Sequence, residues 1–531
     1  MFSVKKQKGT YMERRNFIKY GAMLSSGAAL TSVGFSVVGH SRSFEGLTYR
    51  QKKAIADFNP LCVPPLLYNP YAKRYRMPTL YIQDTQHEFY PGKKSYATGI
   101  STLQHHGSYL GPTIKVKRGD IVDFSVVNLR SEPVTNHWHG LHIPGRLDGG
   151  PHQMIHPGET WNISMPIHQE AATCWYHDHT CGKTAEQVYF GHAGMFIIED
   201  KNSVLLGLPD IYGINDIPII LQDKLFDAAG QQIYDLKPNR VFTGDTYCIN
   251  GVANPFISVM PGLVRFRILN ASNARPYNLF FSDTIFYVIA SDGGFLNQPE
   301  QVEKILVLPG ERVEIIVDFS KFRGGMLDMK AVTLPSDPFD PDYITVTIAK
   351  IVVNSYQLKE TILANSLRHS EIQRDFITNT LSDISRSFEL MVDDELSKMS
   401  INNKEFDMKF INEEVKIDIP EIWEIKSLKG GHNFHVHGCS FLVLELYGEE
   451  PDNTLKGWKD TIALPKRIGE MNEGEYHTCK ILVKFNYNTY RKEYMKHIES
   501  RSDINYHIPY MYHCHVLEHE DKGMMGQFIV Y

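Results

Sequence analysis

Short stretches of alternating apolar and polar residues, separated by turn residues, recur along this chain and constrain its fold more than any other feature. Residues 112–129, with the sequence P-T-I-K-V-K-R-G-D-I-V-D-F-S-V-V-N-L, alternate on both sides of a Gly-Asp turn. This is the pattern of a hairpin with one buried face. Similar runs occur at 263–270, 303–319 and 480–485. Strands this short and this regularly interrupted favour β-sandwiches or barrels over a parallel α/β sheet.

The length of the chain predicts several domains, because 531 residues exceed the size at which a single core stops growing. Two segments, D-I-V-D-F-S-V-V-N-L and G-L-V-R-F-R-I-L-N-A-S, resemble each other in pattern, which indicates an internal repeat. Three sandwiches of roughly 130 to 160 residues would fill the chain. We therefore expect an all-β protein with an N-terminal segment at 1–45 and sandwich domains at 46–205, 206–355 and 356–531.

The N-terminus differs in charge from the rest of the chain. Residues 1–40 carry six Lys or Arg and one Glu, whereas the whole chain has a net charge of −6. The acidic remainder repels phosphate backbones, so nucleic acid is not expected as a partner. Arg14 and Arg15 precede a mildly apolar stretch rich in Gly and Ser, which is typical of a twin-arginine export signal. A single membrane anchor or a chance Arg pair is the alternative.

The rest of the chain has no run of 18 uninterrupted apolar residues, so no stable membrane insertion is expected once the signal is removed. The export signal predicts a periplasmic protein, and we expect a monomer. Its seven cysteines show no compact framework of spacings. No disulfide pairing is predicted from them.

Histidines are concentrated in the two outer domains. Between residues 201 and 431 there is one histidine, His369, so the middle domain is expected to be a spacer. The outer domains contain four H-x-H pairs: His137/His139, His177/His179, His435/His437 and His513/His515. Residues two apart on a strand point to the same face, so each pair would present two imidazoles together. Roughly one H-x-H pair is expected by chance in a chain of this composition, which makes four pairs suggestive of a metal cluster.

The last H-x-H pair encloses a cysteine, and this is the most specific feature of the sequence. Strand alternation places Cys514 on the face opposite His513 and His515, so one short segment would contact two different sites. His519 and Met524 follow Cys514 closely in the sequence. A thiolate, two imidazoles and a weak thioether are the ligands of a blue-copper centre, and His432 is the natural second imidazole donor.

These four blocks resemble the copper-binding signatures of the multicopper oxidases. The resemblance extends from about residue 70 to the C-terminus and includes L-D-G-G-P at 147–151, V-I-A-S-D-G-G at 288–294 and G-W-K-D-T at 457–461. It is strongest to the bacterial branch with three cupredoxin-like domains, which includes periplasmic cuprous oxidases, bilirubin oxidases and spore-coat laccases. The resemblance implies three cupredoxin-like Greek-key β-sandwiches. Asn433 stands where the family often has Pro.

The resemblance also implies four copper ions and assigns their ligands. The type 1 copper would be bound by His432, Cys514, His519 and the axial Met524. His137 and His435 would bind the type 2 copper. The type 3 pair would be held by the remaining six histidines: His139, His177, His179, His437, His513 and His515.

The same resemblance implies a laccase-like oxidase. Electrons from a reducing substrate would enter across an exposed edge of His432 or His519, and Cys514 would carry them to the cluster, where O2 is reduced to water. Asp148 and Glu520 match acidic positions that supply protons in the family. The alternative roles for these two residues are a turn aspartate and a solvated glutamate.

The reducing substrate stays open between a phenol-type compound, Cu(I) and Fe(II). Residues 326–410 contain no methionine cluster, which weakens a dedicated Cu(I) site, because soft thioethers bind that ion. The charged segment at 488–503 either shapes donor access or is a solvated excursion. A non-catalytic periplasmic copper-binding or structural protein on the same fold is the alternative function. A copper nitrite reductase is disfavoured by the eight cluster ligands.

Overall fold

The structure is a computed structural model. It describes residues 40–41, 47–236, 240–334, 343–355, 362–368, 383–393, 398–428, 431–464, 476–485 and 508–531. The expected export segment at 1–45 lies almost entirely outside these ranges, and the charged segment at 488–503 lies wholly outside them. Within the described ranges, no helix combines the length and the apolar character that crossing a membrane requires.

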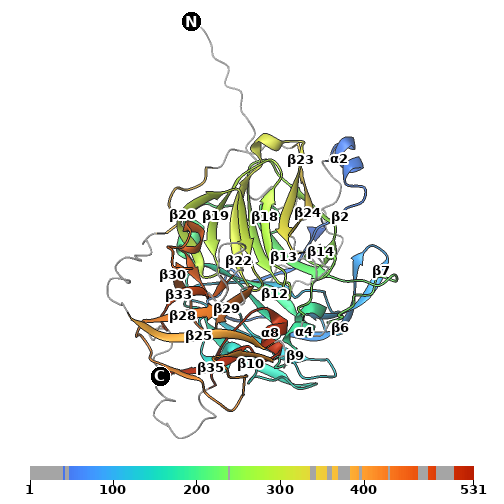
Figure 1. The fold of residues 1–531 in the computed structure, drawn as a ribbon. Coiled ribbons are helices and arrows are strands. Elements are labelled where there is room, and N and C mark those ends of the chain that lie inside the picture. Colours follow the sequence, from blue (N-terminus) through green and yellow to red (C-terminus); the bar gives the residue numbers. More distant parts are fainter. Residues whose placement is uncertain are drawn as a thin grey trace.

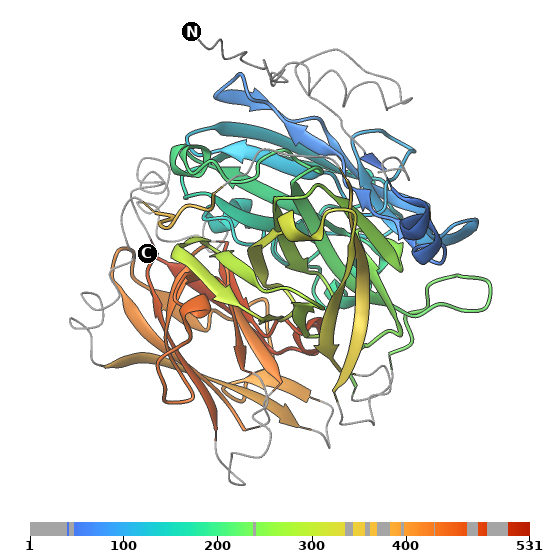
Figure 2. The same cartoon turned by 90° about the horizontal axis from the view of Figure 1, so that it is seen from above.

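Three β-sandwiches follow one another along the chain, and each contacts the other two (Figure 1, Figure 2). The first packs a sheet in the order β10-β9-β6-β7, with β5 on β9, against a sheet in the order β11-β12-β8-β4. Its strands are β4 (Leu66–Tyr68), β5 (Arg74–Arg76), β6 (Leu80–Tyr90), β7 (Lys93–Ser101), β8 (Thr113–Lys117), β9 (Ile121–Asn128), β10 (Thr160–Pro166), β11 (Ala172–His177) and β12 (Ala193–Glu199).

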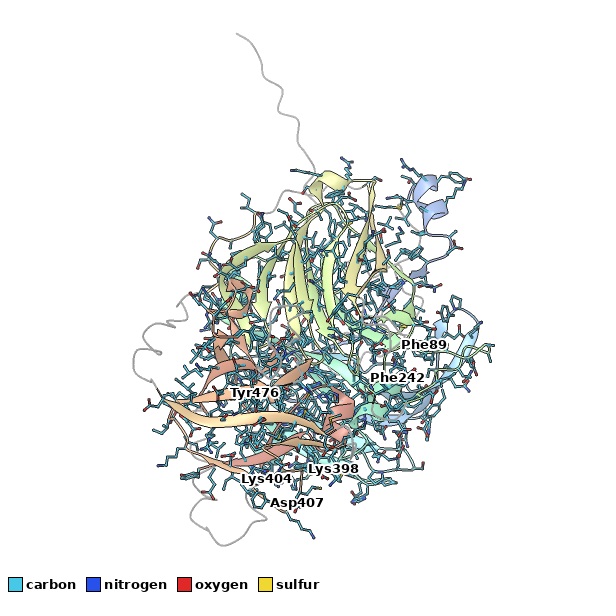
Figure 3. All side chains as sticks on the ribbon, viewed as in Figure 1. Phe89, Phe242, Lys398, Lys404, Asp407 and Tyr476 are labelled. Atoms are coloured by element: carbon cyan, nitrogen blue, oxygen red, sulfur yellow. The ribbon has the colours of Figure 1, made fainter. Side chains whose placement is uncertain are left out.

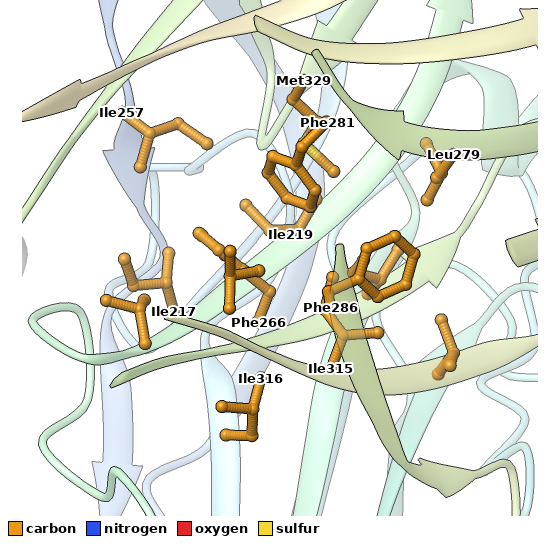
Figure 4. Packing of buried hydrophobic residues seen from close by; sticks show 14 of the residues in the cluster. Ile217, Ile219, Ile257, Phe266, Leu279, Phe281, Phe286, Ile315, Ile316 and Met329 are labelled. Atoms are coloured by element: carbon orange, nitrogen blue, oxygen red, sulfur yellow. The ribbon is translucent and has the colours of Figure 1, made fainter. Parts of the chain in front are cut away.

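The second sandwich has sheets in the orders β15-β14-β13-β17-β22-β19-β20 and β2-β16-β24-β23-β18-β21. Phe281 from one sheet packs against Phe266 and Phe286 from the other, with ring centroids 6.2 and 5.7 Å apart (Figure 4). The strands are β2 (Asn59–Pro60), β13 (Asp216–Lys224), β14 (Thr246–Ile249), β15 (Val252–Ala253), β16 (Pro255–Val259), β17 (Leu263–Asn270), β18 (Tyr277–Phe281), β19 (Phe286–Ser291), β20 (Gly294–Val302), β21 (Lys304–Val307), β22 (Arg312–Asp318), β23 (Met326–Thr333) and β24 (Ile344–Val353).

The third sandwich has sheets in the orders β26-β25-β28-β33-β30-β31 and β27-β35-β34-β29-β32. Its strands are β25 (Ile384–Asp393), β26 (Lys398–Ile401), β27 (Glu413–Val415), β28 (Glu421–Ser427), β29 (His432–Val436), β30 (Phe441–Leu446), β31 (Trp458–Lys459), β32 (Thr461–Leu464), β33 (His477–Val483), β34 (Tyr510–His513) and β35 (Met525–Val530). The prediction of an all-β chain is thus confirmed.

Helices are short and lie at the edges of the sandwiches or between them. They are α2 (Tyr49–Ala54), α3 (Gly145–Asp148), α4 (Thr184–Phe190), α5 (Lys201–Leu205) and α8 (Leu517–Asp521), with 3-10 turns η1 (Ser320–Phe322) and η2 (Asn453–Leu455). A small two-stranded sheet joins β1 (His40–Ser41) to β3 (Cys62–Val63). All seven cysteines lie in the described ranges, and all are free thiols.

The predicted hairpin at 112–129 is wrong in its pairing, although both of its strands exist. β8 and β9 flank the Gly-Asp turn but belong to opposite sheets of the first sandwich. The same arrangement recurs at 303–319, where β21 and β22 lie in opposite sheets of the second sandwich. Alternation along a strand reports one buried face, and a strand facing the core from either sheet satisfies it equally.

The internal repeat is visible in hydrogen bonds as well as in sequence. β9 and β17 each pair parallel on one side and antiparallel on the other, β9 with β6 and β10, and β17 with β13 and β22. Each ends in a fully buried asparagine whose amide donates to two backbone carbonyls, while its oxygen accepts from the backbone two residues later. These residues, Asn128 and Asn270, fix the same turn in two successive sandwiches.

The described residues at the N-terminal end attach to the second sandwich. The amide of Gln51, in α2, donates to the backbone oxygens of Gly325 and Val353 at 3.1 and 2.9 Å. The next segment continues as β2, which pairs parallel with β16 of the second sandwich. The chain therefore crosses the second sandwich before it builds the first, and the domain boundaries stay predictions.

A buried lysine stands out in the second sandwich. Lys224, at the end of β13, has no exposed surface and forms no ion pair with any described residue. Its ammonium donates to the backbone oxygen of Tyr189 and lies 4.0 Å from the centroid of that ring. The ring centroid of Phe89, which is labelled in Figure 3, lies 6.0 Å from the ammonium. Burial lowers the pKa of Lys224 to about 7.

We predict that Lys224→Met raises the melting temperature, and that the gain is larger at about pH 6.5 than at about pH 9. The unfolded chain holds this proton up to a pKa of about 10.4, so wild-type stability rises with pH above 7, by at most about 1.4 kcal/mol per pH unit. Calorimetry of both proteins at the two pH values measures this. Lys115→Met, which breaks the buried pair with Glu199, is the matched control and should lower the melting temperature. A gain for Lys224→Met that does not change with pH contradicts the prediction.

Candidate metal centres

The four H-x-H pairs meet where the first and third sandwiches face each other. His177 ends β11 and His513 ends β34, while His137 bridges His177 through two backbone hydrogen bonds of 2.7 and 3.1 Å. His435, in β29, lies opposite His513 in strand register. Each pair therefore straddles a strand end or lies in a loop, rather than within one strand as expected. All eight imidazoles are buried.

The first candidate group is formed by three histidines from different segments. The Nε2 atom of His513 lies 3.2 Å from the Nε2 atoms of both His179 and His437. The outward nitrogens face groups that can only accept: Nδ1 of His437 donates to Oδ2 of Asp148 at 2.7 Å, and Nδ1 of His513 donates to the backbone oxygen of Cys514 at 3.2 Å. In the neutral form of His437 and His513, the inward Nε2 atom therefore carries a lone pair, and a cation bound between such lone pairs would satisfy both.

A second candidate group contains His139, His177 and His515. Nδ1 of His139 lies 3.3 Å from Nε2 of His177, and the ring centroids of these histidines lie 5.0 and 5.5 Å from that of His515. His139 is turned around relative to the other histidines, because its Nε2 lies 3.2 Å from Oδ1 of Asp460. Neither ring nitrogen of His515 has a hydrogen-bond partner.

The third candidate group is the pair His137 and His435. Their Nδ1 atoms donate to the backbone oxygens of Asp148 and Asp460 at 2.9 and 2.8 Å. Both Nε2 atoms are buried without a partner. Unsatisfied buried nitrogens are costly in a folded protein, and a metal ion between these two would satisfy both.

Burial and neighbouring charges determine the protonation states of several of these histidines and of Glu520. Burial lowers the pKa values of His139, His177, His437 and His515 well below their ordinary value, so the imidazoles are neutral, as metal ligands must be. Burial alone would raise the pKa of Glu520, but the adjacent His179 and His513 hold it well below its usual range. Glu520 lies 3.2 Å from His179 and 3.1 Å from His513.

A separate centre is built around the last cysteine. The Sγ atom of Cys514 lies 3.6 Å from Nδ1 of both His432 and His519, and Met524 is fully buried beside them. The backbone of Cys514 donates to the oxygen of Met524 at 3.1 Å, which fixes the two residues relative to each other. Burial raises the pKa of the Cys514 thiol to about 12, so a bound cation is needed to stabilise the thiolate.

The structure distinguishes the two proposed electron entry points. His432 is buried, whereas His519 is partly exposed. Asn433, where the family often has Pro, donates from its amide to the backbone oxygen of Pro309 at 2.7 Å and places its own oxygen 3.6 Å from Sγ of Cys514. This residue links the thiolate centre to the second sandwich.

Three carboxylates around the histidine cluster had no role assigned from sequence. Asp460 contacts His139, Asp178 ties the first two H-x-H segments together, and Asp521 accepts from the backbone of Thr184 and Ala185 at 2.9 Å. The last contact joins α8 of the third sandwich to the start of α4 of the first. Asp460 and Asp178 lie within the blocks G-W-K-D-T and W-Y-H-D-H, which was the available signal.

Comparisons with known proteins agree with this geometry. Residues 90–203, 203–325 and 379–531 match family models described as multicopper oxidase. The chain belongs to the multicopper oxidase family. Its cupredoxin-type sandwiches and a copper-binding site are shared with that family.

Individual relatives cover most of the chain. A multicopper oxidase from Staphylococcus haemolyticus is 35% identical over 464 residues, 86% of this chain and 89% of the relative. The cell division protein FtsP of Xenorhabdus nematophila is 36% identical over 484 residues, 88% and 92% of the two chains. The structure of a laccase-like multicopper oxidase CueO from Ochrobactrum sp. superposes with a TM-score of 0.75 at 34% identity, covering 89% of this chain and 100% of that one.

Asp178 holds two of the histidine segments by a reciprocal clamp. Its carboxylate accepts from the backbone of Thr135 at 3.0 Å and of Thr180 at 2.7 Å, while the Thr135 hydroxyl accepts from the backbone of His179 at 2.6 Å. An amide offers one oxygen where the carboxylate offers two. Asp178→Asn would therefore leave one buried backbone N–H group facing an NH2 group.

We predict that Asp178→Asn lowers the stability by about 1–3 kcal/mol and reduces the copper content after reconstitution. Asp120→Asn is the matched control, because Asp120 is also buried and accepts from the Lys117 backbone and the Tyr75 hydroxyl, away from the histidines. Both of these bonds go to Oδ2, so the single amide oxygen of Asn can keep them, and this variant should lose less stability and keep its copper. Melting curves and elemental analysis of both variants measure this, and equal copper loss in the two would contradict a specific role for Asp178.

Proposed function

We propose that this protein is a copper-dependent oxidase that couples one-electron oxidation of a small reducing substrate to the four-electron reduction of O2 to water. The observation that carries this proposal is the convergence of lone pairs from His179, His437 and His513 at 3.2 Å, beside further buried nitrogens without partners. Copper ions at these positions would supply reversible one-electron chemistry and a place for O2 to bind. Four ions are proposed: one type 1, one type 2 and two type 3.

The ligand assignment follows the candidate groups. His432, Cys514, His519 and Met524 would bind the type 1 copper. His137 and His435 would bind the type 2 copper through Nε2. The two remaining groups, His139 with His177 and His515, and His179 with His437 and His513, would each bind one type 3 copper.

Electron transfer is proposed to run along the backbone of the last H-C-H segment. Cys514 is bonded through one peptide unit to each of His513 and His515, so the thiolate centre and the cluster share one short covalent path. The partly exposed edge of His519 is the proposed entry point for electrons. A small donor that approaches this edge does not need to enter the buried interior.

Two carboxylates are proposed to deliver the protons that O2 reduction consumes. Asp148 holds Nδ1 of His437 with one oxygen at 2.7 Å, while its other oxygen is buried without a partner. Glu520 lies beside His179 and His513 on the opposite flank of the group. Both carboxylates lie within 3.2 Å of a histidine of the cluster, and proton transfer requires distances in this range.

The donor is proposed to be a phenol-type compound, Cu(I) or Fe(II), and the location to be the periplasm after twin-arginine export of a monomer. The solved relative from Ochrobactrum sp. is described as active toward lignin model compounds. The similarity to relatives named as cell division proteins supports a second candidate function, that of a non-catalytic copper-binding or structural protein. Copper content together with O2 uptake separates the two functions.

The decisive experiment reconstitutes the protein with copper and measures copper content, the visible and EPR spectra, and O2 uptake with a phenol, Cu(I) and Fe(II) in turn. The oxidase is expected to bind four copper ions, to show an intense thiolate-to-copper band, and to consume O2 with at least one donor. Copper binding without O2 uptake from any donor would favour the structural function.

We predict that Cys514→Ser abolishes the thiolate-to-copper band and electron entry from the donor, because serine does not provide a soft thiolate ligand. Cys479→Ser is the matched control, since Cys479 is an equally buried free thiol in the same sandwich. The control should keep the band, and a band that survives in Cys514→Ser would exclude this cysteine as the type 1 ligand.

We predict that Glu520→Gln and Asp148→Asn each slow O2 turnover by about 10²-fold or more while reduction of the type 1 copper by the donor keeps its rate. An amide preserves size but carries no transferable proton. Glu518→Gln, in the same helix α8 and equally buried, should leave turnover unchanged, because its contacts with Tyr234 and Asn273 survive in the amide. Stopped-flow absorbance separates the two steps, and a loss confined to type 1 reduction would contradict the proton role.

A further inference from the structure

The second sandwich, expected to be a spacer, sends one side chain to the histidine cluster. Arg312 begins β22 and has 1% of its surface exposed. Its guanidinium forms a two-pronged pair with Asp460 of the third sandwich, with Nη1 to Oδ1 at 2.7 Å and Nη2 to Oδ2 at 2.5 Å. Its Nε donates to the backbone oxygen of Thr173 in β11 at 3.0 Å. One residue therefore connects all three sandwiches.

Asp460, which Arg312 holds in place, in turn contacts two of the histidines. Its Oδ1 atom lies 3.2 Å from Nε2 of His139, and its backbone oxygen accepts from Nδ1 of His435 at 2.8 Å. Because a carboxylate can only accept, Nε2 of His139 must carry the proton, and Nδ1 is left with the lone pair that faces His177. The orientation of Asp460 thus decides which nitrogen of His139 is available to a metal ion.

The guanidinium also supports the loop that carries His139. Gly140 has a φ of +87°, and a Cβ atom built on it would lie 2.6 Å from Nη2 of Arg312. The backbone after His139 therefore lies directly against the guanidinium. The same guanidinium donates to the backbone oxygen of Gly310 at 2.9 Å, and a Cβ at Gly310 would lie 2.8 Å from the ring of His515.

Other buried charged residues surround Arg312 and restrict its position. Asp292 accepts from the Arg312 backbone at 2.8 Å through its carboxylate, and Lys459 pairs with both Asp292 and Glu311 at 2.9 and 3.0 Å. All of these side chains are buried. Lysine has a single charged nitrogen and does not reproduce a planar two-pronged pair, so Arg312→Lys is a sensitive substitution.

We propose that Arg312 is a positioning residue of the copper cluster: through its two-pronged pair with Asp460 it selects the Nδ1 atom of His139 as the ligand and sets where the outer sandwiches meet. This inference rests on the proposed function. It assigns the second sandwich a direct part in building the cluster, although that sandwich provides no candidate ligand among its described residues.

The test compares Arg312→Lys with Arg275→Lys after copper reconstitution. Arg275 is the matched control, because it is fully buried in the same sandwich and pairs with Asp223, at 2.8 Å, without contacting the cluster. Both variants should lose melting temperature. Only Arg312→Lys should lose cluster copper, with an affinity reduced by about 10–100-fold and an altered type 2 EPR signal, while its type 1 band is kept. Asp460→Asn should reproduce this result, which covers the case that Arg312→Lys does not fold.

The outcomes separate the two proposals. Wild-type protein that binds four copper ions, alongside Arg312→Lys and Asp460→Asn proteins with unchanged copper content and EPR spectra, overturns the role of Arg312 alone. Equal copper loss in Arg312→Lys and Arg275→Lys also overturns it, since the effect would then follow from stability. Wild-type protein that binds no copper at the cluster overturns the proposed function and this inference with it.

Discussion

The central constraint on this structure is a group of buried neutral imidazoles whose lone pairs point at one another. Most of the outward ring nitrogens donate to oxygens that can only accept, such as the backbone oxygen of Asp148 for His137 and that of Asp460 for His435. This arrangement fixes each tautomer and leaves the inward nitrogens unsatisfied. Without a cation this arrangement is energetically unfavourable. Binding of a cation between the inward nitrogens would therefore stabilise the folded protein.

The strand ends explain how one cluster draws ligands from both ends of the chain. β11 and β34 stop at His177 and His513, where backbone pairing gives way to loops and side chains gain freedom of direction. The two outer sandwiches bring these ends together, and Asp521 and Arg312 hold the arrangement by contacts across the domain boundaries. The scarcity of histidine predicted that the second sandwich is a spacer, but it contacts both candidate metal centres: Arg312 pairs with Asp460, and the backbone of Pro309 accepts from Asn433.

Much of the site was predictable, because its chemistry lies in residue types at short spacing. The H-x-H pairs and Cys514 identify imidazole and thiolate ligands without reference to the fold, and the resemblance to a known family orders them. The strands at 112–129 were also predictable from alternation, but their pairing was not. A strand with one buried face shows the same alternation whichever sheet it belongs to. The alternation therefore predicted a hairpin of β8 and β9, whereas the two strands lie in opposite sheets.

The sequence by itself determined the strand content, the types of the candidate ligands and the short covalent link between the two candidate metal centres, because each depends on residues a few positions apart. Only the tertiary structure decided which nitrogen of His139 faces its neighbours, which of His432 and His519 is partly exposed, and which acidic residues contact the histidine cluster. These depend on contacts between residues more than a hundred positions apart in the chain, such as His139 with Asp460 and Thr173 with Arg312. No local pattern encodes such contacts, since they arise from the way separate sandwiches pack against one another.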